Sequence, residues 1–125
     1  MSCRIRVIVN DDIVLEGELN HSNTANMITS NLPLSGVGET WGEEIYFPIS
    51  LQIEPENPVE VVEEGDLAYW PPMQAFCIFY GPTPVSRGNE IRAAGPVNIL
   101  GKITDDNSRL KQLQGPVNVK VEKVE

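Results

Sequence analysis

The chain has 125 residues, a formal net charge of −9 at pH 7 and a hydrophobic fraction of 41%. This length is enough for one domain with its own core, so we expect a single domain over residues 1–125. The negative charge argues against nucleic acid or an anionic membrane surface as a partner. No apolar run approaches the roughly 18 residues of a membrane span and no export signal opens the chain, so we expect a cytoplasmic protein.

The first twenty residues predict a β-hairpin. Apolar residues recur at every second position on both sides of Asn10-Asp11-Asp12, and Asn and Asp favour the left-handed backbone of a tight turn. If both apolar sets face one core, Val9 lies opposite Ile13 across this loop. The same register predicts two exposed ion pairs, Arg4 with Glu18 and Arg6 with Glu16, each worth about 0.2–1 kcal/mol.

A short helix is expected over about 22–31. Ser22 is a favourable N-cap residue, Ala25 and Ile28 share one helical face, and Pro33 ends the segment. The helix interior is rich in Asn, Ser and Thr, so tertiary packing must stabilise it. We expect it to cover an open end of a sheet structure.

From Pro33 onward the chain is predicted to consist mainly of strands and turns. A long irregular connection is expected from Gly81 to Gly95, and a helical turn is expected near 108–113. The expected strands cover about 44–49, 59–61, 67–70, 75–80, 97–103 and 117–121. About seven or eight short strands with little helix predict an all-β fold, either a closed barrel or a sandwich.

The segment from Gly65 to Gly81 contains five of the chain's eight Trp, Tyr and Phe residues. Its two apolar runs, on either side of Pro71-Pro72, lack the alternation of a strand with one solvent-exposed face. Both faces of these strands must be covered, by a core on one side and by a second layer or a pocket on the other. Strands of this kind favour a barrel over a sandwich.

Three blocks of sequence carry a resemblance to a known family. They are Gly42–Phe47, Gly65–Pro84 with its YWPP and FYGPTP motifs, and Ala93–Ile103 with its GPVN motif. Together with the leading hairpin and the Leu32-Pro33-Leu34 helix exit, their order resembles that of the small prokaryotic cyclophilin-like proteins. The resemblance covers nearly the whole chain and implies a closed cyclophilin-like β-barrel of about eight strands with one short capping helix. It implies no established activity.

The resemblance leaves it uncertain whether the protein is an enzyme. A cyclophilin with peptidyl-prolyl isomerase activity carries an arginine with a phenylalanine five positions later and a glutamine three beyond that. No arginine of this chain has a phenylalanine at that spacing. A weak isomerase would therefore need a differently placed arginine, and Arg87 and Arg92 are the central ones available.

Six residues are candidates for a ligand site. Trp and Tyr carry a polar atom that needs a partner, which favours them at the edge of a pocket. Glu44 falls on the same strand face as Tyr46, whereas Glu43 points to the opposite face. Arg92 is expected to pair with Glu90 in a loop, with a ligand contact as the alternative. The candidates are Trp41, Glu44, Tyr46, Trp70, Tyr80 and Arg92.

No metal or cofactor site is predicted. His21 is the only histidine, and Cys3 and Cys77 lie far apart in the sequence, so neither a zinc spacing nor a catalytic His arrangement is present. The segments containing Gly36-Val37-Gly38 and Gly81 do not open a helix after a strand, as a phosphate-binding loop does. These glycines are assigned to turns that need a positive φ angle.

The leading functional hypothesis is a binding module with an apolar, aromatic-lined pocket for a small molecule or an extended peptide. Two alternatives come from other classes. One is a weak prolyl isomerase that uses a non-standard arginine. The other is a structural subunit whose exposed apolar surface forms a homo-oligomer.

Overall fold

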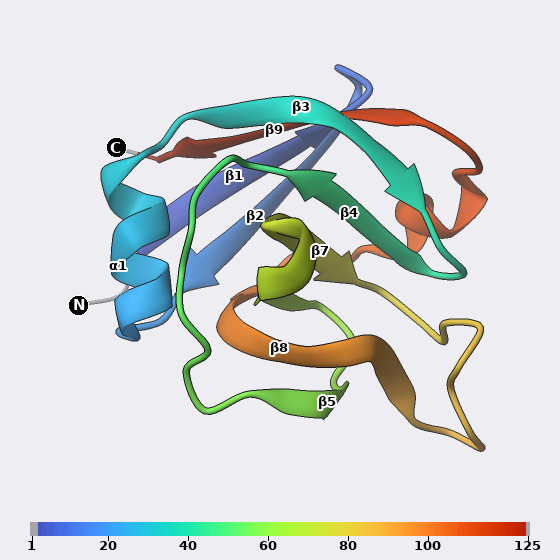
Figure 1. The fold of residues 1–125 in the computed structure, drawn as a ribbon. Helices are drawn as coiled ribbons and strands as arrows, with labels where there is room; N and C mark the ends of the chain where they lie inside the picture. Colours follow the sequence, from blue (N-terminus) through green and yellow to red (C-terminus); the bar gives the residue numbers. More distant parts are fainter. Residues whose placement is uncertain (1–2, 125) are drawn as a thin grey trace.

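Eight strands form a closed ring in the computed structural model, which describes residues 3–124 (Figure 1). The elements of the described residues are β1 (Cys3–Val9), β2 (Ile13–Leu19), α1 (Asn23–Ser30), β3 (Leu34–Thr40), β4 (Glu44–Pro48), β5 (Val59–Val62), β6 (Asp66–Trp70), η1 (Pro71–Met73), β7 (Ala75–Phe79), β8 (Ile91–Ile103), η2 (Ser108–Gln112) and β9 (Val117–Lys123). The ring runs β2-β1-β9-β3-β4-β7-β6-β8, and β8 closes it by pairing with β2. The predicted closed β-barrel is confirmed, and β5 is an additional strand paired with β8.

The N-terminal hairpin has the predicted register. Val9 pairs with Ile13, and Asn10 and Asp11 take the left-handed backbone with φ angles of 53° and 64°. The register places Arg4 opposite Glu18 and Arg6 opposite Glu16, as predicted, but the ion pairs that the arginines form are with other carboxylates. The observed pairs are Arg4–Glu16 at 3.0 Å and Arg6–Glu122 at 3.1 Å, in place of Arg4–Glu18 and Arg6–Glu16.

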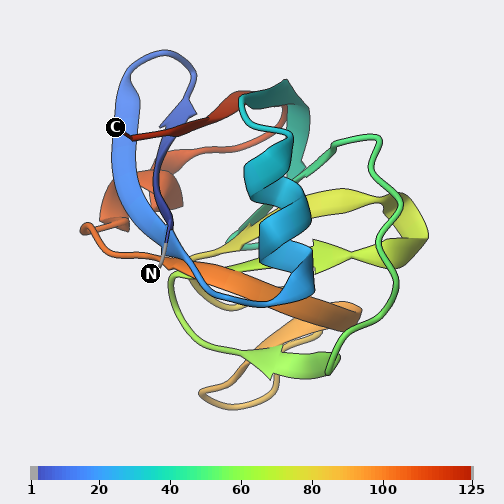
Figure 2. The same cartoon turned by 90° about the vertical axis from the view of Figure 1, so that its left-hand side faces the viewer.

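Helix α1 lies where the sequence predicts it. The side chain of Ser22 accepts a hydrogen bond from the backbone N–H of Ala25 at 3.1 Å, as an N-cap residue does. Ala25 and Ile28 are fully buried, so one face of the helix belongs to the core of the barrel (Figure 2). No helix within residues 3–124 is long and apolar enough to cross a membrane.

Two glycines expected in turns lie instead within strand β3. Gly36 and Gly38 have no positive φ angle. Their lack of a side chain allows close packing: a Cβ on Gly38 would lie only 2.6 Å from the carbonyl oxygen of Tyr46. Gly81 also lacks a positive φ, and a Cβ there would collide with the Glu43 carboxyl. The prediction of turns at these positions was wrong because close contact, rather than backbone conformation, explains the glycines.

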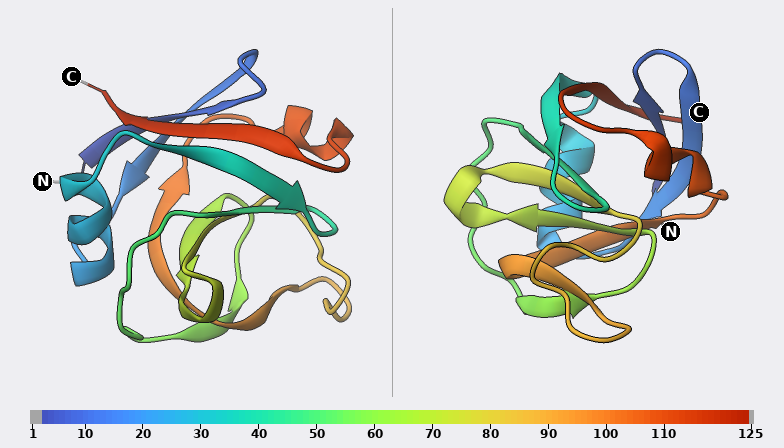
Figure 3. Two further views of the ribbon diagram at one scale, coloured as in Figure 1. Left: turned by 45° about the horizontal axis from the view of Figure 1, so that its top comes forward. Right: turned by 90° about the vertical axis from the view of Figure 1, so that its right-hand side faces the viewer.

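Strand β8 begins at Ile91, well before the start predicted at Val97. Its first half pairs with β5 and its second half pairs with β6 and β2, so the strand curves strongly along its length (Figure 3). The Gly95-Pro96 step suggested a turn in the sequence. It lies within the stretch where the β5–β8 register shifts, and such irregularities accommodate Gly and Pro inside a strand.

Strands β6 and β7 are buried on both faces by two separate clusters. Inside the barrel they contribute Leu67, Tyr69, Phe76 and Ile78 to the main core, which Tyr80 joins directly after β7. On the outer face Ala68, Ala75, Cys77 and Phe79 pack against Val62, Ile91, Ala93 and Val97 of β5 and β8. The double cover expected for these apolar strands is therefore present, and the curved β8 supplies the outer layer.

Candidate functional site

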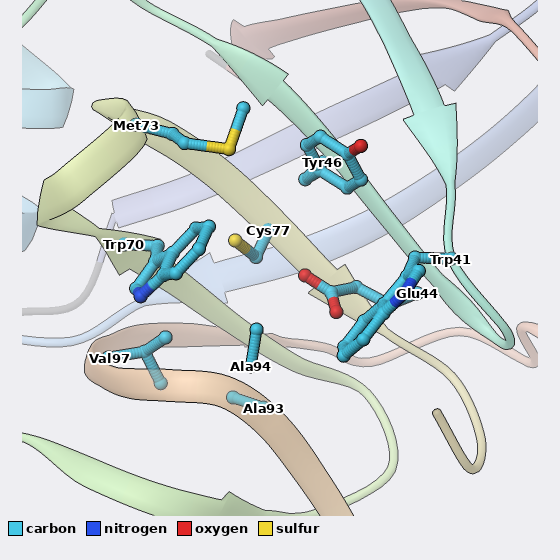
Figure 4. A pocket seen from close by; sticks show the side chains of 9 residues that line it. All are labelled: Trp41, Glu44, Tyr46, Trp70, Met73, Cys77, Ala93, Ala94 and Val97. Atoms are coloured by element: carbon cyan, nitrogen blue, oxygen red, sulfur yellow. The ribbon is translucent and has the colours of Figure 1, made fainter. Parts of the chain in front are cut away.

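A cavity of about 210 Å³ lies on the outer face of the barrel, between strands β4, β6 and β7 and the first half of β8. Figure 4 shows its side chains from close by. Trp41 comes just before β4, and η1 contributes Met73 after β6. The residues that line it are Trp41, Glu44, Tyr46, Trp70, Met73, Cys77, Ala93, Ala94 and Val97.

Strand alternation places the polar residues in this cavity. In β4, Glu44 and Tyr46 are two residues apart and face outward, while Ile45 and Phe47 are fully buried in the barrel core. Tyr46 pairs directly with Cys77 of β7, so the phenol and the thiol stand on the same face of neighbouring strands. The outer face of the β4–β7 pair is thereby the floor of the cavity.

The two tryptophans of the chain lie on opposite sides of the cavity (Figure 4). The backbone N–H of Trp41 donates to the Glu44 carbonyl at 2.8 Å, and Gly42 follows with a φ of 60° that permits the tight turn. The other ring, that of Trp70, packs over Gly95 of β8. A Cβ on Gly95 would lie 3.1 Å from the indole Nε1 of Trp70, so the glycine leaves room for that ring.

The Glu44 carboxyl is the main polar group of the cavity. The residue is only 6% exposed, and burial raises the pKa of its carboxyl to about 7, with a hydrogen bond from Cys77 acting in the opposite direction. Its Oε1 atom is buried and has no hydrogen-bond partner among the described residues. Figure 4 shows the carboxyl directed into the cavity between Trp41 and Cys77. Near neutral pH this carboxyl can therefore accept a hydrogen bond, donate one, or balance a positive charge.

Cys77 is a neutral group at this site. Burial is the main cause that raises the pKa of its thiol well above the ordinary value, and the neighbouring Glu44 charge adds to the effect. A nucleophilic cysteine needs the opposite environment, in which a positive charge or a helix N-terminus stabilises the thiolate. Cys77 is thus suited to packing and to a weak hydrogen bond rather than to covalent chemistry.

Four of the six candidate residues come together at the cavity, and two do not. Tyr80 is 1% exposed and belongs to the barrel core, and burial raises the pKa of its phenol to about 12. Arg92 projects from β8 away from the cavity, where its Nε donates to Glu90 at 2.7 Å and its Nη1 donates to Glu60 at 3.0 Å. The predicted Glu90–Arg92 ion pair is therefore present.

Five lining residues were not among the candidates, namely Met73, Cys77, Ala93, Ala94 and Val97. Cys77 carried a usable signal, because alternation put it on the face opposite Phe76 and Tyr80 in a strand that needed cover on both sides. The three lining residues of β8, Ala93, Ala94 and Val97, carried no such signal in the sequence. Their contribution depends on the curvature of a strand whose first half was expected to be irregular.

The cavity wall contains no Lys, Arg or His, so no described side chain that lines it can neutralise an ionised Glu44. Within residues 3–124 no group of three or more His, Cys, Asp and Glu is placed to hold a metal ion. The arrangement is an apolar cavity with aromatic walls and a single acidic group.

Comparisons with known proteins agree on the family. A family model described as cyclophilin-like matches residues 3–122. Among solved structures, the chain is similar to the hypothetical protein AF2241 from Archaeoglobus fulgidus, with a TM-score of 0.81 and 36% sequence identity over 98% of this chain and 95% of that one. No protein with a curated description matches this chain. The match from Cys3 to Glu122 takes in every strand of the ring except the last residue of β9, and the chain belongs to the cyclophilin-like family.

Proposed function

We propose that this protein is a binding module whose cavity on the outer face of the barrel takes a small molecule, or a small part of an extended peptide. One observation supports the proposal most strongly. Both tryptophans of the chain stand half-buried around this cavity instead of packing inside the barrel. Large aromatic side chains left at a concave surface beside a few polar groups are typical of ligand sites.

The size of the cavity limits what it can hold. Sites for drug-sized ligands measure roughly 300–1,000 Å³, and this cavity measures about 210 Å³. An occupant of the size of one side chain or one small metabolite fits better than several residues of a peptide. A prolyl isomerase would also need an arginine beside the proline, and the candidate Arg92 is engaged by Glu60 and Glu90 and does not line the cavity.

Intrinsic fluorescence tests the proposal directly, because Trp41 and Trp70 are the only tryptophans. A panel of small polar and charged fragments is titrated into the wild-type protein and into two variants, Trp41→Phe and Trp70→Phe. Binding at the cavity should shift the emission of each remaining tryptophan in a saturable way. If ligands bind, as judged by calorimetry, without moving either emission, the site lies elsewhere and the proposal fails.

A protease-coupled assay with a proline peptide accompanies the titration. No acceleration is expected, because the lining residues include no arginine. A rate increase that disappears in Arg92→Ala would instead favour the isomerase alternative.

A further inference from the structure

We infer that the ligand class of this cavity is a small organic cation carrying an alkylammonium group, held between Trp41 and Trp70 with Glu44 as its counter-charge. The inference rests on the proposed function, since it names the chemistry of the occupant of the same cavity. Three features carry it: the aromatic walls, the position of the Glu44 carboxyl, and the lack of any positive side chain among the described residues that line the site.

The aromatic side chains suit a cation. Trp41, Tyr46 and Trp70 reach the cavity from three different places in the fold, and Figure 4 shows their rings on different sides of the Glu44 carboxyl. The face of an aromatic ring attracts cations, tryptophan most strongly, and clusters of such rings recognise methylated ammonium groups. An uncharged apolar ligand would gain the same burial but not this electrostatic attraction.

The Glu44 carboxyl favours a ligand with a positive charge over a purely apolar one. Its Oε1 is buried with no hydrogen-bond donor among the described residues, and Figure 4 shows the carboxyl directed into the cavity. An apolar occupant would leave that oxygen unpaired and out of water, which is costly. An ammonium group supplies the missing positive charge, and beside a carboxyl that is 6% exposed the attraction is stronger than in bulk solvent.

No side chain among the described residues that line the cavity competes with a bound cation for the charge of Glu44. From β7 the titratable neighbour is Cys77, whose thiol is neutral. Directly after β7, the phenol of Tyr80 is also neutral, because burial and then the charges of Glu43 and Glu44 raise its pKa to about 12. The other titratable side chain of the cavity, Tyr46, lies on β4 itself, and β6 presents Trp70. Strand β8 presents only Ala93, Ala94 and Val97 at the wall. The net charge of −9 also favours the approach of cations over anions.

The alternative occupant is a neutral ligand that accepts a hydrogen bond from the protonated carboxyl of Glu44. The two alternatives differ in the sign of their pH dependence. A cation binds the ionised carboxylate, so its affinity increases with pH. A neutral acceptor binds the protonated acid, so its affinity decreases with pH. With a pKa of about 7 for Glu44, the ionised fraction changes about 30-fold between about pH 5.5 and about pH 8.

The test compares choline with 3,3-dimethylbutan-1-ol, which has the same shape without the charge. Both are titrated into the intact protein at about pH 5.5 and about pH 8, with tryptophan emission and calorimetry as readouts. We expect choline to bind more tightly than the alcohol at the higher pH, and to lose up to about 30-fold in affinity at the lower pH. A short peptide carrying trimethyllysine, titrated in parallel, distinguishes a side chain from a free small molecule as the source of the cation.

Two variants keep the test decisive. Glu44→Gln preserves the size of the side chain and should reduce the preference for choline and abolish its pH dependence, while Trp41→Leu should weaken choline more than the alcohol. Thermal unfolding of each variant confirms that it is folded. If the alcohol binds as well as choline at about pH 8, or if choline itself binds more tightly at about pH 5.5 than at about pH 8, the cation inference is overturned while the binding function stands. If neither compound binds at millimolar concentration, the inference is overturned and the proposed function is judged on the fragment panel.

Discussion

Replacing Glu44 by glutamine is expected to change how the stability of the protein depends on pH. The carboxyl is 6% exposed, and its pKa rises from an ordinary 4.5 to about 7 in the folded state. The folded state therefore holds this proton more tightly than the unfolded chain. At pH values below the pKa of Glu44 in the unfolded chain, the carboxyl is protonated in both states and does not lower the free energy of unfolding. As pH rises through the folded pKa, the native state must bury a charge and is destabilised.

The magnitude follows from the two pKa values. Each pKa unit corresponds to about 1.4 kcal/mol, so the shift destabilises the native state above about pH 7 by about 3 kcal/mol. Glutamine has nearly the same shape and cannot ionise. We therefore expect Glu44→Gln to be about as stable as the wild type near pH 4 and more stable by up to about 3 kcal/mol near pH 8.

Urea unfolding of both proteins at a series of pH values measures this difference. The difference between the two proteins isolates Glu44 from the other acidic residues, and Glu64→Gln provides a control that removes one negative charge from an exposed position. The reasoning is refuted if the free energies of unfolding of wild type and Glu44→Gln run parallel from about pH 4 to about pH 8.

Two further substitutions test the packing that positions the site. Gly38→Ala should destabilise the fold by about 1–3 kcal/mol, because the new methyl group would lie 2.6 Å from the Tyr46 carbonyl oxygen. Urea unfolding measures this loss, and an unchanged midpoint would mean that β3 and β4 can separate freely. Asn98→Ala should cost about 1–3 kcal/mol or more, because the buried amide donates to Thr24 Oγ1 at 3.1 Å and to the Glu54 carbonyl at 2.9 Å. Hydrogen exchange should then show selective loss of protection in helix α1, and a loss spread evenly over the barrel would contradict the role of Asn98 as an anchor for the helix.

The fold was predictable where local pattern and tertiary environment agree. Alternation in the first hairpin and the N-cap at Ser22 are short-range signals, and both appear in the structure as expected. The unbroken apolar runs around Pro71-Pro72 also predicted burial on both faces correctly, because a strand with a solvent-exposed face cannot tolerate them.

The wrong predictions at the glycines have one physical origin. Each of these glycines is explained by a contact with a distant segment of the chain. Gly38 is explained by the approach of Tyr46, and Gly95 by the indole of Trp70. Neither contact can be read from neighbouring residues, so one glycine was assigned to a turn and the other to an irregular connection.

The candidate site shows the same limit. Trp41, Glu44 and Tyr46 lie close together in the sequence, and alternation together with polar character was enough to group them. Ala93 and Ala94 reach the cavity only because β8 curves between β5 and β2. Small apolar residues carry no chemical signal of their own, so only the folded chain reveals them as a wall.

The most direct test of the account is an NMR titration of the side-chain carboxyl carbon of Glu44 with and without choline. The account predicts a pKa of about 7 in the free protein, and a lower pKa when the cation occupies the cavity, because a nearby positive charge favours the ionised form. A Glu44 pKa at the ordinary value of 4.5 that choline does not move would contradict it.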